Sequence, residues 1–178
     1  MRKRDLLVMR RLLIVGQAPS RTSDPRRPLE GDRIKRALTG LLGIDEATYL
    51  REVERVNLLA TWAPKESGGE GDAFDRALGR AAAACLANGH LRFPSQRHVL
   101  LLGRNVARAF DGVWTPPSRL ADGVPIRWHV RNQTVWVAVL PHPSGVNRWW
   151  NDPKNRRAAR RFMRRLGRAV SGGETWPA

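Results

Sequence analysis

The chain has 178 residues, of which 42% are hydrophobic, and its 32 lysines and arginines against 16 acidic residues give a net charge of +16. This length and composition predict one soluble globular domain over residues 1–170, followed by a flexible tail over residues 171–178. So large an excess of arginine indicates a polyanionic partner, most simply nucleic acid, although arginine-rich codon usage would supply part of it.

Cysteine and histidine usage excludes several kinds of site. With Cys85 as its only cysteine, the chain cannot form an intrachain disulfide or hold a cysteine-ligated cluster. The four histidines lack the spacing of a metal site, so we expect no cofactor, no metal and no metal cluster. Arg10 and Arg11 interrupt the apolar N-terminal run and no long apolar span follows. We therefore expect an intracellular, cytoplasmic, nucleoid-associated monomer without membrane contact.

The first part of the chain predicts a strand, a loop and two helices. The apolar run 11–15 predicts a buried strand, and the stretch 16–31, rich in Pro, Gly, Ser and Asp, predicts an irregular loop. Apolar residues at helical spacing predict a helix that begins at Asp32 and stops at Gly43. A second short helix is expected over 45–51.

Strands and helices continue to alternate in the middle of the chain. Residues 53–59 predict a second strand with Asn57 near its end, and residues 98–102 predict a third that Gly103 connects to a helix over 104–110. Residues 72–88 predict a helix with one buried face. That face is expected to contain Phe74, Ala77, Leu78, Ala81, Cys85 and Leu86.

The last third predicts a hairpin and a long basic helix. Residues 126–130 and 135–139 alternate between apolar and other side chains, which is typical of paired strands. Asp152 followed by Pro153 is a helix start. The apolar face of that helix is predicted to be Ala159, Phe162, Met163, Leu166 and Val170. The whole pattern predicts an α/β fold: a single-domain three-layer α/β/α sandwich with a central, mostly parallel four-stranded sheet.

A stiff loop with one histidine follows the strand that ends at residue 140. Pro141 and Pro143 flank His142 and prevent a strand or helix from continuing. Ligands of open α/β sheets bind beyond the carboxyl ends of the strands, so the loop predicts a site. The equally weighted alternative is a proline-rich turn around a solvated histidine. The following helix carries a run of basic residues, for which the ordinary interpretation is a solvated face. Its place directly after the loop favours phosphate contacts.

Four motifs occur in order at the predicted strand ends: GQAPS at 16–20, VNLLATWAP at 56–64, LLLGRNVARAF at 100–110 and HPSGVN at 142–147. Together they resemble the uracil-DNA glycosylase superfamily over residues 11–165. The pattern is closer to the G-x-A-P branch, without that branch's iron–sulfur cysteines, than to the G-Q-D-P-Y branch. The resemblance implies a DNA glycosylase, which flips a base out of DNA and hydrolyses its N-glycosidic bond. No lysine falls in these motifs, which favours a monofunctional enzyme over a lyase.

The resemblance also implies roles for individual residues. His142 would donate a hydrogen bond to a base carbonyl, where negative charge develops. Asn57 would read the base edge, unless it bonds to local backbone instead. Gln17 and Ala18 would offer backbone groups near the base and the water. The expected DNA contacts are Ser144, Val146, Asn147, Arg148, Trp149, Arg160, Arg161 and Arg164.

The chain departs from the family pattern at several of these positions. Ala18 replaces the water-activating aspartate of G-Q-D-P; Asp32 is the first substitute, with a plain helix N-cap as its alternative, and Asp24 is the second. Leu29 replaces an aromatic residue that stacks on the base, and Ser20 replaces a tyrosine that excludes larger bases. A roomier pocket follows, for a damaged or 5-modified pyrimidine or a deaminated purine, including a bulky base of phage DNA in a defence role.

Two hypotheses from other classes compete with a glycosylase. One is a catalytically silent protein of the same fold that binds DNA or abasic sites through its arginine-rich helix and the Trp149-Trp150 loop. The other is a phosphohydrolase or nucleotide-binding α/β protein, which is disfavoured because the chain has no phosphate-binding G-x-x-x-x-G-K-[ST] loop.

Overall fold

The computed structural model describes residues 12–20, 24–61, 74–89, 98–110, 126–130, 133–143 and 147–172. Along the chain its elements are β1 (Leu12–Gly16), α1 (Asp32–Leu42), α2 (Glu46–Glu52), β2 (Val53–Asn57), α3 (Arg76–Gly89), β3 (His98–Leu102), α4 (Arg104–Ala109), β4 (Ile126–Val130), β5 (Gln133–Leu140), the 3-10 helix η2 (Arg148–Asn151) and α6 (Pro153–Gly172). No helix in this part of the chain is both long enough and apolar enough to cross a membrane.

The centre of the fold is a parallel sheet. Its strand order is β2-β1-β3-β5-β4, in which the first four strands run parallel and β4 pairs antiparallel with β5. The predicted α/β fold is confirmed, and the predicted hairpin adds β4 as a fifth, antiparallel edge strand. Parallel strands are covered on both faces, and accordingly every residue of β1 and β3 is buried.

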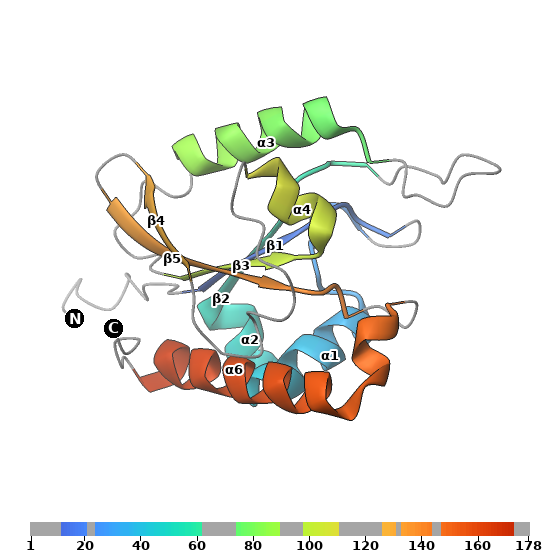
Figure 1. Ribbon diagram of the computed structural model, residues 1–178, viewed down its shortest axis with the longest axis vertical. Coiled ribbons are helices and arrows are strands. Elements are labelled where there is room, and N and C mark those ends of the chain that lie inside the picture. The colour runs from blue at the N-terminus through green and yellow to red at the C-terminus, as the bar shows by residue number, and fades with distance from the viewer. Residues whose placement is uncertain are drawn as a thin grey trace, which may run out of the picture.

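Helices form a layer on each face of the sheet (Figure 1). α3 and α4 pack together on one face, and α1, α2 and α6 pack together on the other. The predicted start of α6 is confirmed, because Asp152 Oδ1 accepts a hydrogen bond from the Lys154 amide at 2.7 Å. The helix reaches Gly172, two residues into the predicted tail. Its buried inner face contains Ala159, Phe162, Met163 and Leu166; the side chain of Val170 lies outside the described part of the chain.

The predicted buried face of α3 is wrong at four of its six residues: Ala77, Leu78, Ala81 and Cys85 are exposed, with Leu78 at 57%. Leu86 is buried and Phe74 is partly buried against the core, as predicted. The helix also buries Gly79 and Ala83. Small apolar residues occur on all sides of this helix, so the periodicity of its sequence has little contrast. The ring of Phe74 occupies the space that a Cβ on Gly79 would need.

Candidate active site

The carboxyl ends of the parallel strands bring the predicted motifs to one edge of the sheet. β1 ends at Gly16 and β2 at Asn57, and these two residues are register partners. Gly103 follows β3, and the loop with His142 follows β5. Neighbouring strands lie about 4.8 Å apart. Because β3 lies between them, the ends of β1 and β5 are about 10 Å apart.

Gly16 leaves a space that two side chains fill. A Cβ on Gly16 would collide with Oδ1 of Asn57 and lie 2.9 Å from Cδ2 of Leu29. The Oδ1 atom of Asn57 is buried, and no donor among the described residues reaches it. Within the described part of the chain, Oδ1 therefore makes no bond to local backbone. A buried acceptor without a donor costs about 1–3 kcal/mol, so this oxygen is suited to an N–H group of a ligand.

Leu29 is held beside Gly16 in an uncommon backbone conformation. Its φ of 59° lies in the left-handed region, which non-glycine residues seldom adopt. Tyr49 is fully buried, and its hydroxyl donates a hydrogen bond to the Leu29 carbonyl at 3.2 Å. Burial raises the pKa of Tyr49, which keeps this donor protonated. Leu29 is thus a fixed apolar wall next to Asn57.

Arg55 ties the Leu29 segment to β2. Its Nη2 lies 2.8 Å from Glu30 Oε1, and its Nη1 donates to the carbonyls of Val53 and Tyr49 at 2.7 and 2.9 Å. The guanidinium also lies 5.0 Å from the centroid of the Tyr49 ring. Because the side chain of Arg55 is only 10% exposed, these charge-assisted contacts are little screened by solvent. Through Glu30 and Tyr49 they hold the Leu29 segment in place.

Gln17 is bridged to α4 by Asn105. Asn105 Nδ2 donates to Gln17 Oε1 at 3.1 Å, and the Gln17 carbonyl accepts from the Leu59 amide at 2.9 Å. The sequence-based site did not include Asn105. It lies in the first turn of α4, three residues after the end of β3, whereas Asn57 is the last residue of β2. A search of strand ends therefore misses Asn105, and only one that included the first helical turn after each strand would have found it.

His142 lies between the start of α4 and η2. Gly103 has φ of 93°, its amide donates to the Leu140 carbonyl at 2.8 Å, and a Cβ there would lie 3.5 Å from Cβ of His142. On the other side, Trp150 Nε1 donates to the His142 carbonyl at 3.0 Å. The sequence singled out Trp150 only as part of a DNA-binding loop, not as a partner of His142. The histidine is partly buried, so it is not simply a solvated side chain on a turn.

The two candidate carboxylates lie in exposed local structure. Asp24 closes a turn, because its Oδ1 accepts from the Arg26 amide at 2.9 Å. Asp32 is the first residue of α1, with its side chain 79% exposed and 3.7 Å from Lys35 Nζ. Gly31 is the N-cap, so the alternative that Asp32 caps the helix is wrong. The water-orienting role of either aspartate stays a prediction.

The model of one protein family, described as the uracil DNA glycosylase superfamily, matches residues 8–167. This match covers nearly the whole chain and extends from before β1 into α6. The chain belongs to the uracil DNA glycosylase superfamily. Members of this superfamily are in general DNA glycosylases, hydrolases that act on DNA in repair. A comparison with curated proteins finds no match. The predicted family is confirmed, while the G-x-A-P branch rests on the motif residues alone.

Members of this superfamily contact DNA. Several of the residues expected to make such contacts in this chain also contact other parts of the protein. Asn147 caps η2, with Oδ1 accepting from the Trp149 amide at 3.1 Å. A Cβ on Gly43 would lie 3.4 Å from Nη1 of Arg164. This guanidinium therefore lies at the C-terminal end of α1, where a cation offsets the helix dipole. The exposed residues of the set are Arg148, Arg160, Arg161 and Arg164. Ser144 and Val146 lie outside the described residues.

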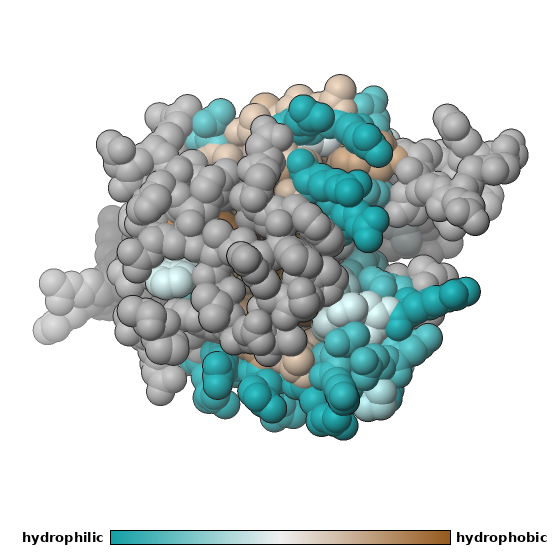
Figure 2. All heavy atoms as spheres, viewed as in Figure 1, coloured by the Kyte–Doolittle hydropathy of each residue, from teal (hydrophilic) through white to brown (hydrophobic). Residues whose placement is uncertain are grey.

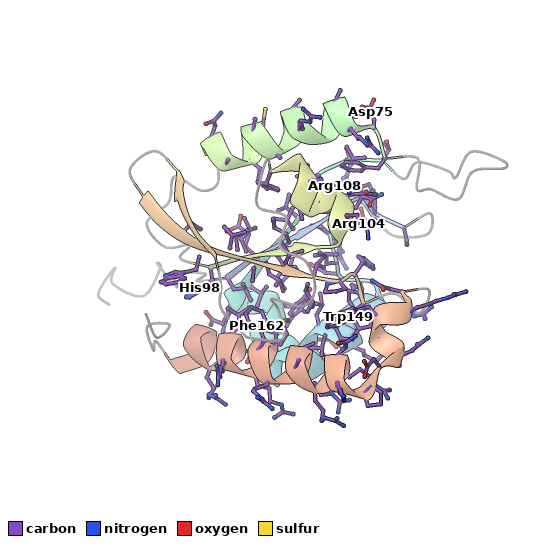
Figure 3. The ribbon with its side chains drawn as sticks, viewed as in Figure 1. Asp75, His98, Arg104, Arg108, Trp149 and Phe162 are labelled. Carbon is purple, nitrogen blue, oxygen red and sulfur yellow. The ribbon has the colours of Figure 1, made fainter. Side chains whose placement is uncertain are left out.

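Basic side chains occur on both sides of the strand ends. Arg104 and Arg108, which were not predicted, are exposed on α4. Figure 3 shows both at the same end of the molecule as Trp149, with the sheet between them, while His98 lies toward the opposite end. Figure 2 shows hydrophilic side chains over α4 and over α6. A superfamily member with its site at this end would present arginine on either side of it.

Proposed function

We propose that this protein is a monofunctional DNA glycosylase that flips a damaged, deaminated or modified base out of DNA and hydrolyses its N-glycosidic bond, leaving an abasic site. One observation supports this most strongly. Oδ1 of Asn57 is buried, and no donor among the described residues reaches it; it lies at the same edge of the sheet as His142, in a chain whose family acts on DNA. An acceptor and an imidazole at that edge suit a base that carries an N–H beside a carbonyl.

The two groups would share the work of stabilising the departing base. Breaking the glycosidic bond leaves negative charge on the base, and a donor aimed at a base carbonyl lowers the energy of that charge. His142 would be this donor, and Asn57 would accept the base N–H. The backbone of Gln17 and Ala18 would face the base and the attacking water, which Asp32 or Asp24 would orient when DNA is bound.

The substrate would be larger than uracil or would include larger bases. Ala18, Ser20 and Leu29 are smaller than the residues that restrict a strict uracil reader. This supports a damaged or 5-modified pyrimidine or a deaminated purine, and a role against phage DNA with bulky bases. If uracil were excised far faster than every other base tested, this part of the proposal would be wrong.

The exposed face of α6 would contact the DNA backbone. Arg156 and Arg168 are twelve residues apart, so the arginine face extends over about 18 Å at 1.5 Å per residue. That length corresponds to about five base pairs. η2 leads from the His142 side of the site directly into α6, so the arginines nearest the start of the helix would hold phosphates closest to the flipped nucleotide.

A base-excision assay tests the activity. Oligonucleotides with uracil, hypoxanthine, xanthine, mismatched thymine and 5-modified cytosines, single- and double-stranded, would be treated with protein and then with alkali. His142→Ala should lower the single-turnover rate about a hundredfold to a thousandfold with DNA affinity retained. Absence of cleavage on every substrate, with tight DNA binding, would contradict the proposal and support a silent DNA-binding protein.

A salt titration tests the DNA surface separately. The double variant Arg160→Ala/Arg161→Ala should bind DNA more weakly, and the slope of log affinity against log salt should fall by about one for each phosphate that the protein no longer neutralises. Arg76→Ala/Arg80→Ala, which removes two exposed arginines from α3 on the other face of the sheet, is the matched control. Equal reductions of affinity in the two variants would mean that α6 has no special role. Arg164 is left intact because of its place over α1.

A further inference from the structure

We infer that Trp150 is a positioning residue that fixes the imidazole of His142 through the main chain. The inference deepens the proposed function, because it concerns how the proposed donor to the base is held. Trp150 Nε1 donates to the carbonyl oxygen of His142 at 3.0 Å across eight residues of chain. This bond holds the peptide group between His142 and Pro143 in one orientation, and the direction of the His142 side chain follows from it.

The backbone on either side of His142 cannot donate hydrogen bonds. Pro141 and Pro143 flank His142 and have no amide hydrogen, so neither can donate a hydrogen bond. Their rings fix φ at both positions but leave the peptide plane after His142 to be set by a partner. A rigid indole N–H, which can only donate, is suited to that task.

Trp150 is itself held firmly enough to act as an anchor. Its amide donates to the Asn147 carbonyl at 3.2 Å, and its ring meets Trp149 edge-to-face, with centroids 4.9 Å apart and planes at 88°. Asn155 of α6 donates from Nδ2 to the Trp149 carbonyl at 3.0 Å. Both tryptophans pack against the hydrophobic core. η2 is therefore attached at its start by Asn147 and from α6 by Asn155.

Gly103 at the start of α4 is a second neighbour of His142. A Cβ added to Gly103 would lie 3.5 Å from Cβ of His142, so the glycine leaves room for about one methyl group beside the histidine. This contact alone therefore does not fix the loop, and the bond from Trp150 to the His142 carbonyl is needed. A catalytic donor must be held within about 0.5 Å of its productive position, and an error of about 1 Å can lower a rate a hundredfold.

The test compares Trp150→Phe with Trp136→Phe in the full-length protein. Both variants remove an indole and keep an aromatic ring, but only the first removes the donor to His142. Trp136 is the register partner of His98 in the sheet, toward the opposite end of the molecule from the site. We expect Trp150→Phe to lower the single-turnover excision rate at saturating DNA by about tenfold to a hundredfold, with the Kd for DNA unchanged. Trp136→Phe should retain a rate within about threefold of wild type. A loss of folding stability alone would not lower the rate while leaving the Kd for DNA unchanged.

A second readout does not need activity. NMR spectra of nitrogen-labelled protein, with the His142 ring resonances assigned by their loss in His142→Ala, should show these resonances shifted and broadened in Trp150→Phe and unchanged in Trp136→Phe. Unchanged His142 resonances in Trp150→Phe, or equal changes in both variants, would overturn the inference. If wild type excises no base, the proposed function fails, while the NMR comparison still decides the role of Trp150.

Discussion

Gly16→Ala is the substitution that most directly tests whether the ends of β1 and β2 form the site. The added methyl group would collide with Asn57 Oδ1 and lie 2.9 Å from Leu29 Cδ2, whereas carbon atoms in good contact are about 3.5–4.0 Å apart. Gly16 does not have a positive φ, so alanine causes no backbone strain there. The effect is confined to the two side chains that would face the base.

The size of the effect follows from how tightly those side chains are held. Leu29 cannot retreat freely, because Tyr49 holds its carbonyl and Arg55 holds the neighbouring Glu30. Inserting a methyl group into such a site costs about 1–3 kcal/mol of the free energy of unfolding. Displacement of Asn57 by about 1 Å should lower the excision rate about a hundredfold.

Single-turnover excision and denaturant unfolding measure the two effects. Gly40→Ala on α1 is the control, since nothing lies within 4 Å of its Cβ position, and alanine should stabilise a helix there by up to about 1 kcal/mol. Excision by Gly16→Ala at the wild-type rate would refute the assignment of Asn57 and Leu29 to the site, whatever the change in stability.

Three further substitutions test the supporting structure. Gly167→Ala places a methyl group against the Leu42 carbonyl and should lower the free energy of unfolding by about 1–3 kcal/mol; a denaturant midpoint equal to that of wild type would disprove this close approach of α6 to α1. Asp152→Ala removes the cap of α6 and should cost about 1 kcal/mol, measured by thermal unfolding, and an unchanged Tm would contradict it. Tyr49→Phe should cost about 1 kcal/mol at neutral pH. Burial raises the pKa of Tyr49 above its ordinary value of 10.0. Tyr49 therefore contributes its full share of the free energy of unfolding below pH 10. Above pH 10 this contribution falls, by at most about 1.4 kcal/mol per pH unit. Tyr49→Phe lacks that fall in stability. The chain has one tyrosine, so its ultraviolet absorbance follows ionisation directly, and ionisation at the ordinary pKa in the folded protein would refute the burial argument.

Local features of the sequence predicted most of the fold. Gly43 has φ of 72° and ends α1 as a C-cap glycine, and Asp152 caps α6, because caps depend on residues one turn away. Strand positions followed from short apolar runs. The face of α3 could not be predicted, since alanine-rich sequence gives the same hydrophobic pattern in several orientations. The structure decided it through Gly79 and Phe74, whose fit depends on shape.

The residues proposed to contact the base could be predicted from the sequence, but the partners that position them could not. His142 and Asn57 stand out because each ends an apolar strand. The contact from Asn105 to Gln17 joins residues 88 positions apart, and no spacing rule connects them. The bond from Tyr49 to Leu29 crosses 20 positions and depends on how α2 packs. Such partners follow only from the three-dimensional arrangement.

If the protein is a glycosylase as proposed, these nonlocal partners would let its site work although neither candidate carboxylate is held in place. Leu29 is held by Tyr49, Gln17 by Asn105 and His142 by Trp150, whereas Asp24 and Asp32 are exposed. The residues that would contact the base are thus held more firmly than the carboxylates that would orient the water. A positioned donor gains most where charge develops in the transition state, and here that charge is on the base. We therefore expect stabilisation of the departing base to contribute more to the rate than activation of the attacking water.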